Sequence, residues 1–160
     1  MVLREAKKEE VSDLFQQGYK VWSKGRTWEK YCADNSKEDA YGTRYVLECE
    51  GEIASSMILL KLEEFEGAQV YGIGSVLTSP AYRGKGYASR LLANCLEQIP
   101  DAAIVFLYSE IAPAFYERMG FRVLPPHLQK SSGSVCMARC REDLWEALLR
   151  ASVERIPDHF

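Results

Sequence analysis

Apolar residues recur at helical spacing in one long segment near the middle of the chain. Positions i, i+3, i+4, i+7, i+8 and i+11 of this segment are Ala88, Leu91, Leu92, Cys95, Leu96 and Ile99. Side chains at this spacing share one face of an amphipathic helix, and Pro100 ends it. The following run, 103–108, is continuously apolar and of strand length, which is typical of a strand covered on both faces. With a strand at about 68–78 before the helix, the centre of the chain predicts a strand–helix–strand crossover.

The pattern on either side predicts a mixed α/β (α+β) chain in the order β-α-α-β-β-β-α-β-α-β-β-α. The first helix carries an apolar face made by Val11, Leu14, Phe15, Gly18 and Trp22. The last helix, 141–156, turns Leu144, Leu148, Ala151 and Trp145 inward. We expect the other strands at 2–6, 43–50, 53–62, 121–124 and 134–140, a hairpin turn at 50–52, and the other helices at 27–33 and 111–119.

Composition and charge narrow the class of protein. The chain of 160 residues is 47% hydrophobic and 27% charged, without repeats or linkers, which favours one globular domain over 1–160. A net charge of −3 gives no electrostatic reason to expect nucleic acid or an anionic membrane as a partner. The longest apolar stretch, 102–108, is far shorter than a membrane span of about 20 residues, and the N-terminus is charged. We therefore expect a cytoplasmic protein.

The five cysteines do not form a recognisable framework. They lie at positions 32, 49, 95, 136 and 140, so their number is odd, no pair has C-x-x-C spacing, and His127 and His159 lie far from any cysteine cluster. Disulfide and metal sites are therefore not expected. Cys95 falls on the buried face of the long helix, where a cysteine usually serves as a small hydrophobic residue.

The first candidate functional residues lie between the strand 68–78 and the long helix. Residues 76–88 read Val-Leu-Thr-Ser-Pro-Ala-Tyr-Arg-Gly-Lys-Gly-Tyr-Ala. A helix N-terminus binds anions, Gly84 and Gly86 would let the backbone wrap around a phosphate, and Arg83 and Lys85 add positive charge. The P-loop pattern is absent, and the dinucleotide fingerprint would need a glycine where Ser89 stands. The alternative is that the glycines only form a strand-to-helix turn.

The pattern R-x-x-G-x-A from Arg83 to Ala88 resembles the [QR]-x-x-G-x-[GA] loop of the GNAT-superfamily N-acetyltransferases, which bind the pyrophosphate of acetyl-CoA there. The resemblance implies a mixed, mostly antiparallel, twisted sheet of about seven strands flanked by helices, with 141–156 as an extra C-terminal helix. It assigns acetyl-CoA, used as a co-substrate without a metal, to the loop residues Arg83, Gly84, Lys85, Gly86, Tyr87, Ala88 and Ser89.

The strand before this loop contains Gly72 and Gly74, which often mark a bulge or a close approach by another group. In the superfamily the matching strand bulges, pairs with the pantetheine arm and polarises the thioester carbonyl through a backbone N–H. The resemblance implies this role for Val76, Leu77 and Thr78. Periodicity alone would show only a strand.

A second segment, 109–121, resembles the superfamily pattern N-x-x-A-x-x-F-Y-x-x-x-G-F. It departs at Ser109, which replaces the asparagine that contacts the pantetheine amide, and it matches at Ala112, Phe115, Tyr116, Gly120 and Phe121. The resemblance implies that Tyr116 protonates the departing CoA thiolate. The alternative for Tyr116 is a core aromatic, because Ile111, Phe115 and Met119 fall on the same helical arc.

The general base and the acceptor amine are less well marked. Glu48, Glu63, Tyr71 and Glu110 are candidate bases, each of which can equally be an ordinary surface or strand residue, and a water-relayed base is the alternative. The aromatics gathered in 15–45 form either an aromatic wall for a cationic amine or core packing. Asp34, Glu38 and Asp39 either hold a positive charge or form a solvated acidic loop. The aromatic residues gathered in 15–45 are Phe15, Tyr19, Trp22, Trp28, Tyr31, Tyr41 and Tyr45.

A local likeness to fungal lysine N-acetyltransferases at 107–116 makes an amino acid or related small amine, such as a polyamine, the expected acceptor. One rival interpretation is a peptide or protein N-acetyltransferase, and another is an acyl-CoA-binding regulatory module without turnover. Trp145, Leu148 and Leu149 either pack on the sheet or pair two subunits, so a monomer and a homodimer both remain open.

Overall fold

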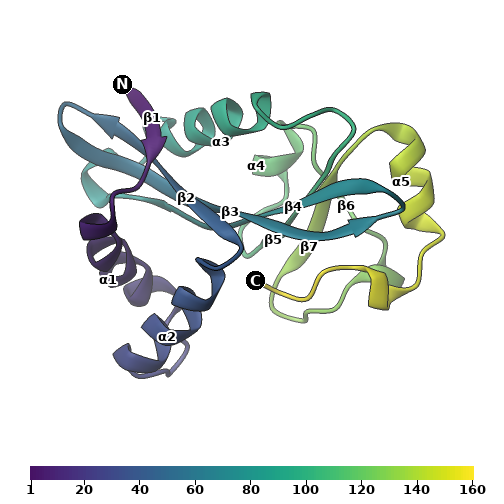
Figure 1. The fold of residues 1–160 in the computed structure, drawn as a ribbon, viewed down its shortest axis with the longest axis horizontal. Coiled ribbons are helices and arrows are strands. Elements are labelled where there is room, and N and C mark those ends of the chain that lie inside the picture. The colour runs from purple at the N-terminus through teal and green to yellow at the C-terminus, as the bar shows by residue number, and fades with distance from the viewer. The chain divides into compact units, whose positions relative to one another are not determined.

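The computed structural model describes residues 1–160. Its elements follow the order predicted from the sequence, and the seven strands form a sheet in the order β1-β2-β3-β4-β5-β7-β6 (Figure 1). The strands are β1 (Val2–Glu5), β2 (Gly42–Cys49), β3 (Glu52–Phe65), β4 (Ala68–Thr78), β5 (Ile104–Ser109), β6 (Arg122–Val123) and β7 (Val135–Arg139). The helices are α1 (Val11–Trp22), α2 (Trp28–Glu38), α3 (Tyr87–Glu97), α4 (Ala114–Glu117) and α5 (Glu142–Leu149).

Strand pairing is mostly antiparallel, as predicted. β2 pairs antiparallel with β1 and β3, and β7 pairs antiparallel with β5 and β6. β4 and β5 pair in parallel, with Val70 opposite Ile104 and Ile73 opposite Leu107. A parallel pair needs a crossover connection, and α3 supplies it between these two strands. The predicted central strand–helix–strand unit is therefore confirmed.

The chain divides into two compact units, and β3 and β4 each contribute to both. The first unit contains Met1–Leu60 and Ser75–Gln98, and the second contains Lys61–Gly74 and Ile99–Phe160. The single domain predicted from the sequence stays a prediction.

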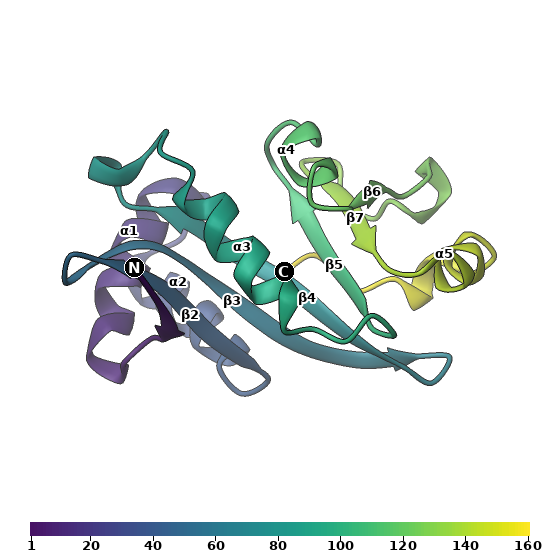
Figure 2. The same ribbon diagram turned by 90° about the horizontal axis from the view of Figure 1, so that it is seen from above.

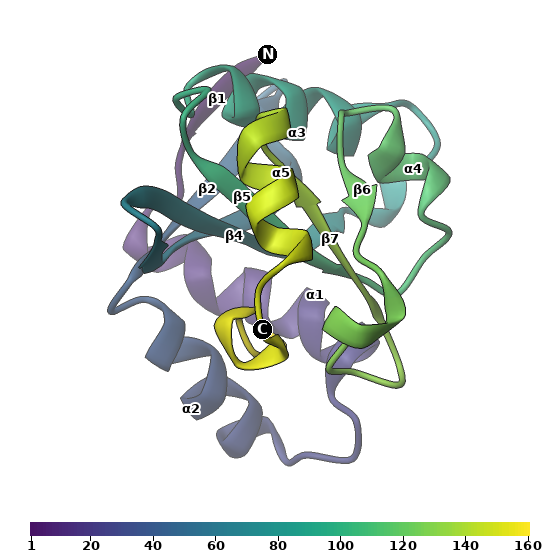
Figure 3. The same cartoon turned by 90° about the vertical axis from the view of Figure 1, so that its right-hand side faces the viewer.

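In the first unit, helices cover both faces of the strands: α1 and α2 lie on one face and α3 on the other (Figures 1 and 3). Leu14 and Phe15 of α1 are buried, as the apolar face predicts. Gly18 on the same face lets Tyr31 of α2 approach closely, because a Cβ at Gly18 would lie 2.4 Å from the Tyr31 hydroxyl. On the opposite face, Leu91, Leu92, Cys95 and Leu96 of α3 are buried as predicted.

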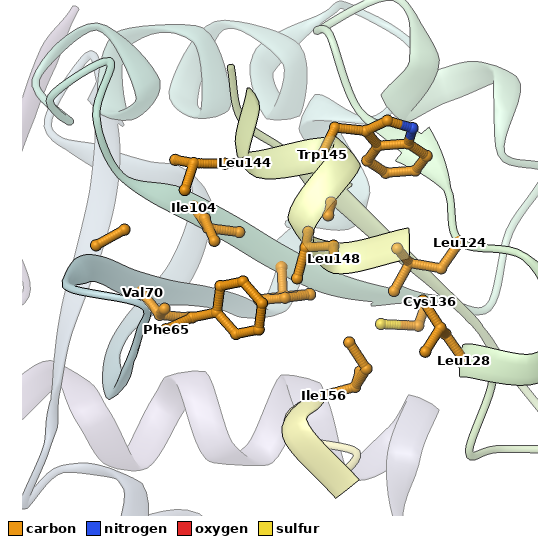
Figure 4. Packing of buried hydrophobic residues seen from close by; sticks show 13 residues of the cluster. Phe65, Val70, Ile104, Leu124, Leu128, Cys136, Leu144, Trp145, Leu148 and Ile156 are labelled. Atoms are coloured by element: carbon orange, nitrogen blue, oxygen red, sulfur yellow. The ribbon is translucent and has the colours of Figure 1, made fainter. Parts of the chain in front are cut away.

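The second unit has its own hydrophobic cluster, in which α5 packs against β5 and β7 (Figure 4). Figure 2 shows β5 between β4 and β7, with α4 beyond the end of β5. Trp145 and Leu148 of α5 are buried in this cluster, so the expectation that they face inward is confirmed. The guanidinium carbon of Arg122 lies 4.5 Å from the centre of the Trp145 ring. The indole is thus covered by this chain's own residues.

Three predicted helix boundaries were wrong. α2 extends to Glu38. The sequence pattern missed this end because the buried position 35 is occupied by a polar residue, Asn35, which hides the helical period. α4 starts only after Pro113, since proline disfavours helical geometry in the residue before it. Ile111, expected on the inner face of that helix, is consequently 55% exposed. α5 ends at Leu149, and Ile156, which precedes Pro157, is extended and buried in the cluster. No helix combines the length and apolar content needed to cross a bilayer.

Candidate active site

The turn from β4 into α3 is anchored to β3 through its first residue, Ser79. The amide of Ser79 donates to the carbonyl of Ala54 at 2.9 Å, and its hydroxyl donates to the carbonyl of Ile53 at 2.8 Å. A short 3₁₀ turn, Pro80–Tyr82, follows and delivers the chain to Arg83. The predicted phosphate loop is thus held at its start by hydrogen bonds to the backbone of β3, while Gly84, Lys85 and Gly86 are exposed.

The N-terminus of α3 carries unused backbone donors. Its N-cap is Gly86, which adopts φ +80° and supplies no capping side chain. The first bond of the helix runs from the amide of Arg90 to the carbonyl of Gly86 at 3.1 Å, so the amides of Tyr87, Ala88 and Ser89 precede the intrahelical ladder. Free amides at the positive end of the helix dipole form a site that favours an anion.

The two glycines of the loop are needed for backbone conformation, with open space beside them. Gly84 and Gly86 have φ +75° and +80°, values that side chains disfavour, and a Cβ at either would meet no atom within 4 Å. The space beside them is therefore not filled by the protein itself. The expected close approach of a phosphate to this backbone is sterically open.

Two basic side chains flank these amides. Arg83 donates from Nε to the carbonyl of Thr78 at 3.1 Å, which folds it back over the end of β4. The Nζ of Lys85 lies 5.9 Å from the centre of the Tyr82 ring, and the Tyr82 hydroxyl donates to Glu52 at 2.7 Å. This hydrogen bond raises the pKa of Tyr82 to about 12, so the phenol stays neutral near the loop. The basic groups are exposed and available to an anion.

The last residues of β4 have an irregular backbone. Ser75 adopts φ +51°, a left-handed conformation that is typical of a bulge rather than of a regular strand. Beyond it Val76 and Thr78 are partly exposed, and Leu77 is buried. The Ser55 hydroxyl donates to the carbonyl of Leu77 at 2.8 Å and lies 3.3 Å from the Thr78 hydroxyl. Two of the three residues expected to face pantetheine, Leu77 and Thr78, are therefore held by Ser55 of β3.

In the second unit, Ser109 ends β5 and is buried. Its hydroxyl donates to the carbonyl of Ile111 at 2.8 Å and accepts from the amide of Ile111 at 3.3 Å. The hydroxyl thus holds the turn that follows its own strand. These bonds occupy its single proton, so any contact with a pantetheine amide would have to use the remaining acceptor capacity of the oxygen.

Tyr116 belongs to α4 and is 8% exposed. Its ring packs edge-on against Phe115 and Phe121, at centroid distances of 4.9 and 6.1 Å. Burial alone raises the pKa of the phenol above its ordinary value of 10, with no charged group contributing. A phenol in this environment keeps its proton at neutral pH, as a general acid must. The same packing also fits the alternative that Tyr116 is a core aromatic residue.

The predicted bases and acidic groups are mostly engaged elsewhere. Glu48 accepts from Arg4 at 2.7 Å, and Tyr71 donates to Gln69 at 2.8 Å. Glu63 and Glu110 are exposed. Asp34 pairs with Arg26 and Lys30, and Asp39 pairs with Arg44, so neither is the solvated acid considered above. Glu38 differs: its Oε2 is buried without a hydrogen-bond partner, and burial raises the pKa of its carboxyl group.

The first unit contains a pocket that encloses only about 10 Å³, or about 300 Å³ when the open space at its mouth is included. Part of the predicted aromatic wall lines it: Phe15, Trp22 and Tyr31. Tyr19 and Trp28 are absent from the lining and pack edge-on against each other, with ring centroids 5.6 Å apart, whereas Tyr41 is exposed. The complete lining consists of Leu14, Phe15, Gly18, Trp22, Tyr31, Asn35, Arg44, Ser56, Met57, Ser75 and Leu77.

Sequence reasoning missed the polar members of this lining, above all Arg44 and Asn35. A signal existed for Arg44: in β2 it shares its side of the strand with Val46, which is fully buried. A basic residue at an inward position of a strand indicates a functional or ion-pairing role. The pocket also reaches Ser75 and Leu77 of β4, so it adjoins the strand end that leads to the phosphate loop.

Solved structures with the same fold are numerous but distant in sequence. A probable N-acyltransferase of unknown function from Enterococcus faecalis V583 has a TM-score of 0.66 and 21% identity over 77% of this chain, which spans only 32% of that protein. A structure from Corynebacterium glutamicum, described as histone acetyltransferase HPA2 and related acetyltransferase, has a TM-score of 0.68 and 16% identity to this chain. The match covers 87% of this chain and 95% of that one.

A third similar structure is Naa50 from Arabidopsis thaliana in complex with the bisubstrate analogue CoA-Ac-MVNAL, with a TM-score of 0.64 and 17% identity over 88% of this chain and 98% of that one. No curated protein matches the sequence. The model of the acetyltransferase (GNAT) family matches residues 8–121, more than two thirds of the chain. The chain therefore belongs to the acetyltransferase (GNAT) family and is an N-acetyltransferase that uses acetyl-CoA.

Proposed function

We propose that this enzyme acetylates the primary amine of a small molecule such as an amino acid or polyamine. The observation that carries this proposal is the solvent-open pocket in the first unit. It is walled by aromatic and aliphatic side chains, with a few polar groups, which is the usual composition of a site for a small ligand. The pocket also adjoins Ser75 and Leu77 of β4, next to the residues proposed to bind acetyl-CoA.

In this proposal, the amides of Tyr87, Ala88 and Ser89 and the loop from Arg83 to Gly86 bind the pyrophosphate. Support comes from the uncapped N-terminus of α3, the open space at both glycines and the exposed charges of Arg83 and Lys85. Residues Val76, Leu77 and Thr78 bind the pantetheine arm through their backbone, and Ser109 contributes its hydroxyl oxygen. One backbone N–H of β4 donates to the thioester oxygen, on which negative charge develops.

The reaction is direct transfer without a covalent enzyme intermediate. The neutral amine nitrogen attacks the thioester carbon, and the carbon–sulfur bond of the tetrahedral intermediate then breaks. Tyr116 donates its phenolic proton to the departing thiolate, and the amine proton leaves through water. The phenol of Tyr116 carries its proton at neutral pH, so the acid form is present for this step.

A peptide acceptor is the second candidate. The observation that favours it is the likeness to Arabidopsis Naa50, whose bisubstrate analogue carries a short peptide. A peptide would need an open groove to accommodate the residues after the acetylated one, whereas a single amino acid or diamine needs only a pocket.

Release of free thiol from acetyl-CoA tests the proposal with a panel of amino acids, polyamines, aminoglycosides and short peptides. We expect thiol release with a small amine. Release with peptides alone would replace the small-molecule proposal with the peptide one. If no amine of the panel released thiol although the protein still bound acetyl-CoA, the proposal that the enzyme acetylates small amines would be contradicted.

A further inference from the structure

The pocket of the first unit contains one cation, Arg44, within an otherwise apolar and neutral lining. Its side chain is only 8% exposed, although it carries a permanent charge. Its guanidinium carbon lies 4.8 Å from the centre of the Phe15 ring, which is also in the lining. A buried guanidinium of this kind needs either full pairing within the protein or a ligand that completes it.

The protein uses only part of the hydrogen-bonding capacity of Arg44. Nε donates to Asp39 Oδ1 at 2.9 Å, and Nη2 donates to the carbonyl of Asn35 at 3.2 Å. Nη1 takes part in neither bond. A guanidinium has five N–H donors, so the end formed by Nη1 and Nη2 retains three. This end has the planar fork geometry that matches a carboxylate.

We infer that Arg44 binds a carboxylate of the acceptor, so that the substrate is an amine that also carries an acid group, such as an amino acid. The inference rests on the proposed function and narrows it. It favours amino acids over polyamines and aminoglycosides, since these would bring a further positive charge towards Arg44.

Other charges near Arg44 do not replace this ligand. The Asp39 carboxylate is 42% exposed and occupies the Nε edge of the guanidinium. Glu38 influences Arg44 electrostatically but makes no hydrogen bond through Oε2. Neither carboxylate lines the pocket, whereas Arg44 does. A carboxylate entering the pocket would therefore meet Arg44 as the only charged residue of the lining.

The wild-type enzyme can test this with acceptors that differ only in the acid group. Lysine, lysinamide and cadaverine share the same terminal amine, but only lysine carries a carboxylate, and ornithine and putrescine form a second pair. We expect kcat/KM to be at least about 10-fold higher for the amino acid in each pair, the effect expected of one charged hydrogen bond. Equal or higher kcat/KM for the diamine would overturn the inference.

A matched pair of variants assigns the effect to Arg44. Arg26 also pairs with an aspartate, Asp34, at 3.0 Å and lies 5.0 Å from an aromatic ring, that of Tyr31, but its side chain is 30% exposed and does not line the pocket. We expect Arg44→Gln to lower kcat/KM for lysine at least about 10-fold more than kcat/KM for cadaverine, and so to remove the preference for the carboxylated amine. Arg26→Gln should retain the preference. Equal losses for lysine and cadaverine in Arg44→Gln, or the same loss of preference in Arg26→Gln, would contradict the inference.

The outcomes separate this inference from the proposed function. Acetylation of small amines without a preference for the acid group would leave the proposed function standing and refute the role of Arg44. Absence of acetylation for every small amine would refute the proposed function. Should Arg44→Gln fail to fold, Arg44→Lys takes its place, because lysine keeps the positive charge and loses the planar fork; we expect this variant to show a smaller preference for lysine over cadaverine than the wild type.

Discussion

The hydroxyl of Ser55 in β3 donates a 2.8 Å hydrogen bond to the carbonyl of Leu77 in β4. Both residues are buried, with exposures of 1% and 8%. The bond lies two residues after the irregular position Ser75, so it fixes the backbone of β4 where regular strand geometry has been lost. A side-chain bond of this kind holds a strand end in a shape that strand pairing alone would not give it.

Substitution Ser55→Ala should leave the buried carbonyl of Leu77 without this partner. We expect the free energy of unfolding to fall by about 1–3 kcal/mol, measured by urea denaturation, and the KM for acetyl-CoA to rise. Ser56→Ala is the matched control at the next position, which is also buried. A change in Ser55→Ala no larger than that in Ser56→Ala would show that the bond contributes little.

Substitution Gly86→Glu should abolish acetyl-CoA binding, because it places a side chain and a negative charge in the proposed phosphate site. Calorimetric titration with acetyl-CoA measures the effect. The control is Gly67→Glu, since Gly67 also has φ +80° and open space at the Cβ position. Gly67 precedes β4 and the loop follows it, so both variants suffer similar backbone strain at opposite ends of one strand. Wild-type affinity in Gly86→Glu would refute the loop assignment.

Substitution Tyr116→Phe keeps the packed ring and removes only the hydroxyl. We expect kcat to fall about 10²-fold, with the affinity for acetyl-CoA nearly unchanged. Because burial raises the pKa of this phenol above 10, wild-type kcat should show no loss of the acid form between pH 7 and about 9. Tyr41→Phe, at an exposed tyrosine, serves as the control. Unchanged turnover in Tyr116→Phe would make Tyr116 a core aromatic and no more.

Stability should fall in acid through the ion pair between Arg4 and Glu10. The two side chains form two hydrogen bonds, of 2.8 and 3.0 Å, and these lower the pKa of Glu10 from 4.5 to about 2. Because the pKa of Glu10 is lower in the folded than in the unfolded state, the ionised carboxylate stabilises the folded protein at pH values above about 4.5. This stabilisation is lost as the pH falls from about 4.5 to about 2 and Glu10 becomes protonated.

Thermal unfolding across this pH window tests the ion pair. We expect the Tm of Glu10→Gln to depend less steeply on pH than that of the wild type. The control is Glu9→Gln, which alters an exposed neighbour. If the Tm of Glu10→Gln depended on pH as steeply as the Tm of the wild type, groups other than Glu10 would govern the loss of stability in acid.

The sequence by itself determined the order of elements and the position of the glycine-containing turn between β4 and α3. The helical period of α3, the apolar run of β5 and the glycines of the loop are local signals, because each reflects the geometry of a few consecutive residues. Helix ends were predicted less well where a proline or a buried polar residue interrupted the pattern, as at Pro113 and Asn35.

Only the tertiary structure decided which charged side chains are buried. Asp34 and Asp39 were expected as either acceptor ligands or solvated acids, and the fold pairs both with basic residues from other positions. Arg44 appeared as one basic residue among many, and its place in the pocket depends on α1 and α2 packing over β2. The alternation of Arg44 with Val46 indicates a side of the strand, but the burial of a charge depends on contacts between distant segments, which only the fold brings together.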